Sequence, residues 1–138
     1  MAEGDPVGDP PRRLRVSSGG PWEASIGYSR AVAIGDSCWV SGTTDAGPDG
    51  RSLHPGDAAA QARAAWAIVE RALVEAGFSL GEVVRTRTYV VSGDDALGVA
   101  AVHGELFGEI RPAATLVSVA GLMEPSLLVE VEAEARRG

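Results

Sequence analysis

The sequence lacks several residue types on which common protein chemistries depend. It contains no lysine and no asparagine, and its one cysteine is Cys38. Without lysine, no Schiff base can form on a side chain. A single cysteine excludes an internal disulfide and any cluster of cysteine ligands. His54 and His103 are far apart in the sequence and lack the spacing of a zinc pair, so the sequence predicts neither a metal nor a cofactor.

Long apolar runs and an excess of positive charge are also missing. No apolar run approaches the roughly 20 residues that span a bilayer. The N-terminus has neither the basic region nor the apolar region of a secretory signal. The net charge is −7, and the arginines are scattered along the chain, so a phosphate backbone would be repelled. We therefore expect a cytoplasmic protein that binds neither membranes nor nucleic acids.

A chain of 138 residues fits one domain with one hydrophobic core. Residues 1–11 are rich in glycine, proline and aspartate, and we predict that they form a disordered lead-in. The domain itself is expected to occupy residues 12–138.

Alternating apolar residues and turn signals predict six strands and two helices. Strands are expected at 12–17, 28–34, 37–41, 83–91, 114–120 and 127–135. The dipeptide Gly35-Asp36 is typical of a hairpin turn. A helix is expected from Asp57 to Ala76 because its apolar residues recur at three- and four-residue spacing. A second helix is predicted from Asp94 or Asp95 to Phe107.

The resulting order, β-β-β-α-β-α-β-β, predicts an α+β fold built on a single sheet. Both helices would most simply cover one face of a mostly antiparallel or mixed sheet. The other face must then be solvated or contact another subunit.

Several motifs, in order and in spacing, resemble the Rid/YjgF family. They are RTRTYV at 85–90, RPA at 111–113 and VEVEA at 129–133, together with Gly27-Tyr28 ahead of Val40-Ser41-Gly42. The resemblance covers roughly Ser25 to Arg136. It implies a chorismate-mutase-like α+β fold and a homotrimer with three clefts between subunits. The best-known family activity is hydrolysis of imines and enamines, small reactive metabolites, to ketones and ammonia. The older endoribonuclease label suits this acidic chain poorly.

The chain departs from the deaminating branch of the family at several positions. Ala114 stands where that branch has an arginine that holds the substrate carboxylate. Leu116 replaces a cysteine, Ser118 a glutamate, and Ala100 falls near an expected asparagine. The resemblance retains Tyr28, Ser41, Gly42, Thr115 in place of serine, and Glu130 at the position that holds a water. The positions matched by the resemblance imply a substrate-binding set of Tyr28, Ser41, Gly42, Ala114, Thr115 and Leu116 around Glu130 as the catalytic residue. We add Arg87 to the substrate-binding set as a candidate to replace the missing arginine.

Glu130 has two interpretations. Burial could raise its pKa toward neutrality and suit it to acid–base catalysis. Alternatively, Glu130, Glu132 and Glu134 form one strand face that pairs with arginines of a neighbouring strand. We favour pairing for Glu132 and Glu134 and leave both readings open for Glu130.

Three residues are candidates to replace the missing carboxylate clamp. A guanidinium suits bidentate carboxylate binding, which points to Arg87 or Arg111. Cross-strand pairing accounts equally well for Arg87, and a solvated loop accounts better for Arg111. His103 titrates near neutrality, although a lone helical histidine is more often a packing residue.

Three functional readings follow. The first is a trimer that binds a small metabolite and hydrolyses an imine or enamine in an altered cleft. The second is a non-catalytic ligand-binding or regulatory trimer. The third is an enzyme of specialised metabolism whose substrate lacks a carboxylate, because Ala114 and Leu116 make the cleft more apolar.

Overall fold

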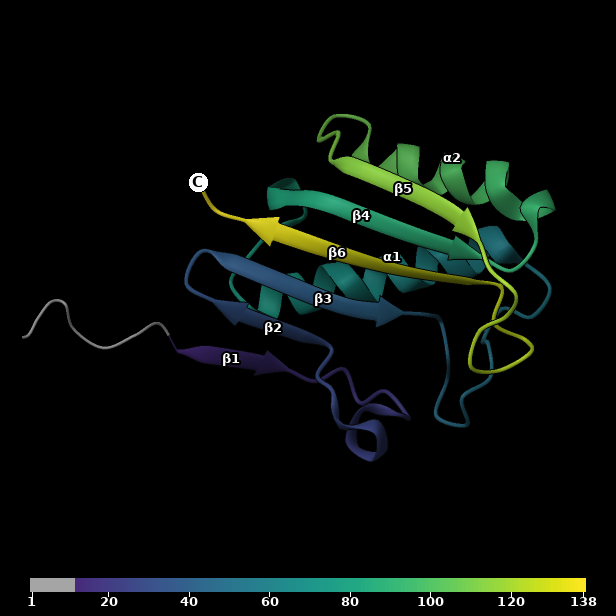
Figure 1. Ribbon diagram of the computed structural model, residues 1–138, viewed down its shortest axis with the longest axis horizontal. Helices are drawn as coiled ribbons and strands as arrows, with labels where there is room; N and C mark the ends of the chain where they lie inside the picture. The colour runs from purple at the N-terminus through teal and green to yellow at the C-terminus, as the bar shows by residue number, and fades with distance from the viewer. Residues whose placement is uncertain (1–11) are drawn as a thin grey trace, which may run out of the picture.

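Six strands form one mixed sheet in the order β1-β2-β3-β6-β4-β5 (Figure 1). The structure is a computed structural model that describes residues 12–138, so the predicted lead-in lies outside the described residues. The strands are β1 (Arg13–Val16), β2 (Ala31–Ile34), β3 (Ser37–Thr43), β4 (Val83–Val90), β5 (Ala113–Ser118) and β6 (Val129–Arg136). All neighbouring pairs are antiparallel except β4 and β5, which are parallel.

The last strand in sequence, β6, lies in the middle of the sheet between β3 and β4. Its alternation explains this place, because Val129, Val131, Ala133 and Ala135 are each at most 3% exposed. A strand with one fully apolar face is stabilised most where neighbours flank it on both sides and helices cover that face.

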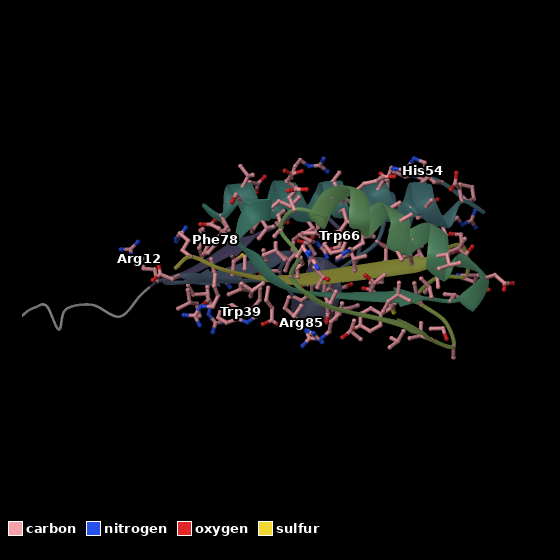
Figure 2. All side chains as sticks on the ribbon, turned by 90° about the horizontal axis from the view of Figure 1, so that it is seen from above. Arg12, Trp39, His54, Trp66, Phe78 and Arg85 are labelled. Carbon is pink, nitrogen blue, oxygen red and sulfur yellow. The ribbon has the colours of Figure 1, made fainter. Side chains whose placement is uncertain are left out.

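Two helices cover the same face of the sheet. Helix α1 (Ala58–Glu75) packs on β3 and β6, and α2 (Ala96–Phe107) packs on α1 and along β5. In Figure 2 both helices lie on one side, with Trp66 between them and the sheet, while Trp39 and Arg85 project from the opposite side. The predicted α+β fold with two helices on one face is therefore confirmed.

Local signals explain where helix α1 begins and ends. The carboxylate of Asp57 accepts a hydrogen bond from the backbone N–H of Ala60 at 3.0 Å, as expected for an N-cap. Gly77 follows the helix with a φ of +87°, a conformation that glycine adopts without strain. The buried stripe of α1 is rich in alanine, so the helix can approach the sheet closely.

Two segments near the functional residues differ from the sequence prediction. Strand β2 begins at Ala31 rather than at residue 28, because Glu23–Gly27 forms a short π-helical turn, η1, that ends at Tyr28. Strand β3 continues past the predicted end at Ser41 to Thr43 through an irregular register. Both differences lie next to predicted site residues, because η1 ends at Tyr28 and the longer β3 includes Gly42.

Candidate functional site

A cavity of about 600 Å³ opens at the end of β3, next to the first residues of β6. Its walls come from the loop that holds η1, the end of β3, the loop around 44–53, the segment 123–127 and helix α1. Four residues that the sequence analysis placed in one site line it together, namely Tyr28, Ser41, Gly42 and Glu130.

A bulge in β3 shapes the floor of this cavity. Val40 pairs with Ala133 and Thr43 pairs with Val131, so Ser41 and Gly42 together face the single residue Glu132. The hydroxyl of Ser41 donates to the carbonyl oxygen of Ser29 at 2.6 Å and ties the bulge to the segment before β2. The side chain of Ser41 therefore holds the backbone at Ser29 against the bulge of β3.

Gly42 is where the carboxylate of Glu130 comes closest to the backbone of β3. A Cβ atom at Gly42 would overlap Oε2 of Glu130. Only glycine leaves room for that carboxylate at the bulge. The glycine after Ser41 is thus required by the position of the Glu130 side chain.

The carboxylate of Glu130 is partly buried and accepts no hydrogen bond within residues 12–138. Burial raises its pKa, the positive charge of Arg30 opposes that rise, and the negative charge of Glu132 adds to it. A carboxylate in this state is available to exchange a proton with a bound molecule.

Arg30 is a residue of this site that the sequence analysis missed. Its side chain is 7% exposed, and Nη1 donates to the carbonyl oxygen of Gly42 at 2.5 Å and to Oγ1 of Thr43 at 2.9 Å. Nε donates to Ser18 at 3.1 Å, and the guanidinium lies 5.4 Å from the ring centroid of Tyr28. The available signal was that Arg30 is the one charged residue in the apolar segment 28–34.

Glu23 compensates the buried charge of Arg30. The two side chains lie 3.6 Å apart, between Nη2 and Oε2. Burial raises the pKa of Glu23, but hydrogen bonds from Ser17, Ser18 and Gly20 outweigh it and hold the pKa below its usual range. The pair fixes η1 and its loop against the bulge of β3.

Arg87 lies outside this cavity, on the open face of the sheet. Its Nη1 contacts Glu134 at 3.0 Å and Glu132 at 3.4 Å, and the hydroxyl of Tyr89 donates to Glu132 at 3.0 Å. The hydrogen bond to Glu134 raises the pKa of Arg87. The predicted cross-strand pairing is confirmed for Arg87, Glu132 and Glu134.

Strand β5 holds the other three predicted binding residues, Ala114, Thr115 and Leu116, apart from the cavity. All six residues of β5 are exposed, and β6 and β4 separate this edge strand from β3. Oγ1 of Thr115 accepts a hydrogen bond from Arg85 at 2.8 Å. A single copy of the chain does not bring these residues to Glu130.

The remaining candidates also lie elsewhere. His103 packs against Trp66 and Phe107, bonds to Thr86 at 2.8 Å, and has a pKa lowered by burial. His54 lies on the helix side of the sheet, with Nδ1 3.0 Å from the buried carboxylate of Asp45 (Figure 2). Arg111 is exposed, with a φ of +56°. Across residues 12–138, no three histidine, cysteine or acidic side chains gather as metal ligands do.

The sequence and the fold both match a family of known proteins. The family model described as Endoribonuclease L-PSP matches residues 21–137. The chain belongs to the Rid/YjgF family. A Mycobacterium tuberculosis member of the YjgF/YER057c/UK114 family is 45% identical and superimposes with a TM-score of 0.82, over 91% of this chain and 100% of that one.

Two curated relatives carry different amounts of functional information. An uncharacterized protein of Streptomyces coelicolor is 41% identical over 90% of this chain and 92% of its own length. The 3-aminoacrylate deaminase RutC of Acinetobacter baylyi is 32% identical over 78% of this chain and 85% of its own. Within the described part of this Rid/YjgF chain, no helix is both long and apolar enough to cross a bilayer.

Proposed function

We propose that this Rid/YjgF protein binds a small metabolite in the cavity and hydrolyses its imine or enamine group, with Glu130 as the acid–base residue. The observation that carries the proposal is the partly buried Glu130 carboxylate, which has a raised pKa and fills the space left by Gly42. The relative named as a 3-aminoacrylate deaminase supports the reaction class.

The proposed reaction needs one water and one proton-transfer group. With the imine protonated, Glu130 accepts a proton from a water molecule as the water oxygen adds to the carbon of the C=N bond, which gives a neutral carbinolamine. The protonated Glu130 then gives that proton to the nitrogen, and the C–N bond breaks. As the carbonyl forms, the hydroxyl proton passes to the departing ammonia, so a carbonyl compound and ammonium leave and Glu130 is again ionised. The cavity supplies orientation through the hydroxyl of Tyr28, which lines the cavity together with Glu130.

We further propose that the working form is a homotrimer with the site between subunits. Two surfaces support this. The exposed edge strand β5 carries Leu116 and Val117, and the open face of the sheet carries Trp39, which is 45% exposed. Such apolar surface often marks a contact between proteins. A neighbouring β5 would then complete the cavity. Light scattering should give three times the chain mass, and a monomer mass at micromolar concentration would contradict the assembly.

The same geometry leads us to expect weak activity on short imino acids. Ala114 offers no guanidinium for a carboxylate, and Arg30 already bonds to Gly42, Thr43, Ser18 and Glu23. This arrangement favours the alternative of a substrate without a carboxylate.

The substitution Glu130→Gln tests the catalytic proposal because it keeps the shape and removes the titratable group. We expect ammonia release from a supplied imine to fall about a hundredfold or more, the usual weight of a general base. The matched control is Glu134→Gln, the same change on the same face of β6 but outside the cavity. Equal turnover in Glu130→Gln and the unmodified protein, with both folded, would rule out a catalytic role for Glu130.

A further inference from the structure

The cavity is polar at one end and apolar at the other. Tyr28, Arg30 and Glu130 gather at the β3 bulge, whereas the outer wall is built from Trp22, Ile26, Leu53 and Met123. The outer wall comes from three loops that are distant in sequence. Its volume of about 600 Å³ falls within the range of roughly 300–1,000 Å³ typical of sites for drug-sized ligands.

The apolar wall is unusual in its exposure. Ile26 is 59% exposed, and Leu53 and Met123 are each 65% exposed, yet all three line this one cavity. Large apolar side chains that converge on a hollow expose surface that a bound molecule would cover. A ligand that buries one of these side chains binds more tightly, because the apolar surface of that side chain is removed from water.

The loops are shaped to hold this wall in place. Gly50 has a φ of +85°, and a Cβ atom there would come within 3.0 Å of the indole of Trp22. The loop containing η1 is fixed by the pair of Arg30 and Glu23 at its other end. The loop that carries Trp22 and Ile26 is therefore held by contacts with Gly50 and with Arg30.

The charge at the polar end restricts the head group of the ligand. One guanidinium, Arg30, lies between two carboxylates, Glu23 and Glu130, and its donors are already engaged. A neutral or cationic nitrogen suits this end better than a carboxylate does. The other cation of the lining is Arg71, which belongs to α1, outside the Arg30 cluster.

We propose that the ligand of this cavity is amphipathic, with a neutral or cationic C=N head group at Glu130 and a hydrophobic body on Ile26, Leu53 and Met123. This inference rests on the proposed function for the head group, whereas the hydrophobic body rests on the cavity wall alone. The residues of the wall would then set specificity without taking part in proton transfer.

Three imines, each generated in the assay by an oxidase, test the requirement for the head group and the requirement for the hydrophobic body independently. The imines of alanine and phenylalanine share a carboxylate and differ in the body, whereas the imine of 2-phenylethylamine keeps the aromatic body without the carboxylate. We expect kcat/KM above the spontaneous rate to be highest for the 2-phenylethylamine imine and lowest for the alanine imine.

Ile26→Ser and Met123→Ser test the wall. Each should lower the preference for the phenylalanine imine over the alanine imine by about tenfold, and should weaken binding of the neutral dye N-phenyl-1-naphthylamine. The matched control is Leu97→Ser on α2, because Leu97 is 86% exposed and lies outside the cavity. That control should change neither measurement.

The outcomes separate this inference from the proposed function. Ammonia release that is fastest with the alanine imine would overturn the hydrophobic body and leave the hydrolysis standing. Dye binding that depends on Ile26 and Met123, with no imine hydrolysed, would support the hydrophobic ligand and count against the hydrolysis. Serine variants that change the mass in solution but neither the dye binding nor the preference would assign the wall to a contact between copies and overturn the inference.

Discussion

Glu130 and Glu134 lie on the same face of β6, four residues apart, but their side chains differ in burial and in hydrogen bonding. Glu134 pairs with Arg87 at 3.0 Å in a ladder of side chains on the open face. Glu130 accepts no hydrogen bond within residues 12–138 and is partly buried beside Gly42. The charges of the ladder on the open face are paired with one another, whereas the carboxylate of Glu130 in the cavity has no hydrogen-bond partner among residues 12–138.

The two arginines show the same contrast. Arg87 has a side chain that is 39% exposed, so water screens its ion pairs. Arg30, with 7% exposure, is bonded on several sides and paired with a carboxylate that is 8% exposed. A buried charge is tolerated only when its partners remain in place. The strand pattern alone therefore does not distinguish a paired acid from a reactive one, whereas the bulge in β3 beside Glu130 does.

The largest expected effect is on folding stability and separates the two arginines. Arg30→Gln removes the partner of the buried Glu23 and should lower the free energy of unfolding by about 3–5 kcal/mol. Arg87→Gln removes an exposed, screened partner and should leave Tm nearly unchanged. Thermal and urea unfolding of both variants measures the difference. Equal losses in the two would remove the distinction between the buried cluster and the surface ladder.

Gly42→Ala tests whether the bulge makes room for the Glu130 carboxylate. The added Cβ should displace Glu130 and lower turnover about a hundredfold, as removal of the general base would. Gly121→Ala is the control, because a Cβ at Gly121 meets nothing within 4 Å. Turnover measured beside circular dichroism would show whether the protein still folds. Full activity in Gly42→Ala would mean that Glu130 does not act from this position.

The smallest expected effect is a dependence of stability on pH. Because the pKa of Glu130 is raised in the folded state, folding favours its protonated form. The cost of its charge is absent below the unfolded pKa and grows as the pH rises through the folded pKa. Glu130→Gln should therefore have a higher Tm than the unmodified protein at neutral pH, and the gap should close as the pH falls toward 4. A gap that widens on acidification would contradict the raised pKa.

Much of the fold could be predicted from the sequence. The alternation of β6, the Gly35-Asp36 turn and the apolar stripe of α1 are local patterns, and each appears as expected. The start of β2 was predicted wrongly and the η1 turn was not predicted, because the loop that carries Glu23 is held by contacts with Arg30 rather than by its own turn signals.

The candidate site was predicted in part. Tyr28, Ser41, Gly42 and Glu130 were placed together by resemblance to the family, and the structure brings them to one cavity. Arg30 was missed because an arginine next to a strand gives no sign, in the sequence, that four polar groups will surround it. The sequence placed Arg87 in the same set, but its nearest partners are the glutamates of the neighbouring strand.

By itself the sequence determined which face of β6 is apolar, where helix α1 starts, and that no lysine or cysteine cluster takes part in chemistry. Those properties depend on neighbours in the chain or on composition. Only the tertiary structure decided which of three glutamates on β6 is free, which arginine is buried, and which loops form the apolar wall. Each of these depends on segments far apart in sequence, because burial and pairing are set by whatever folds against a side chain.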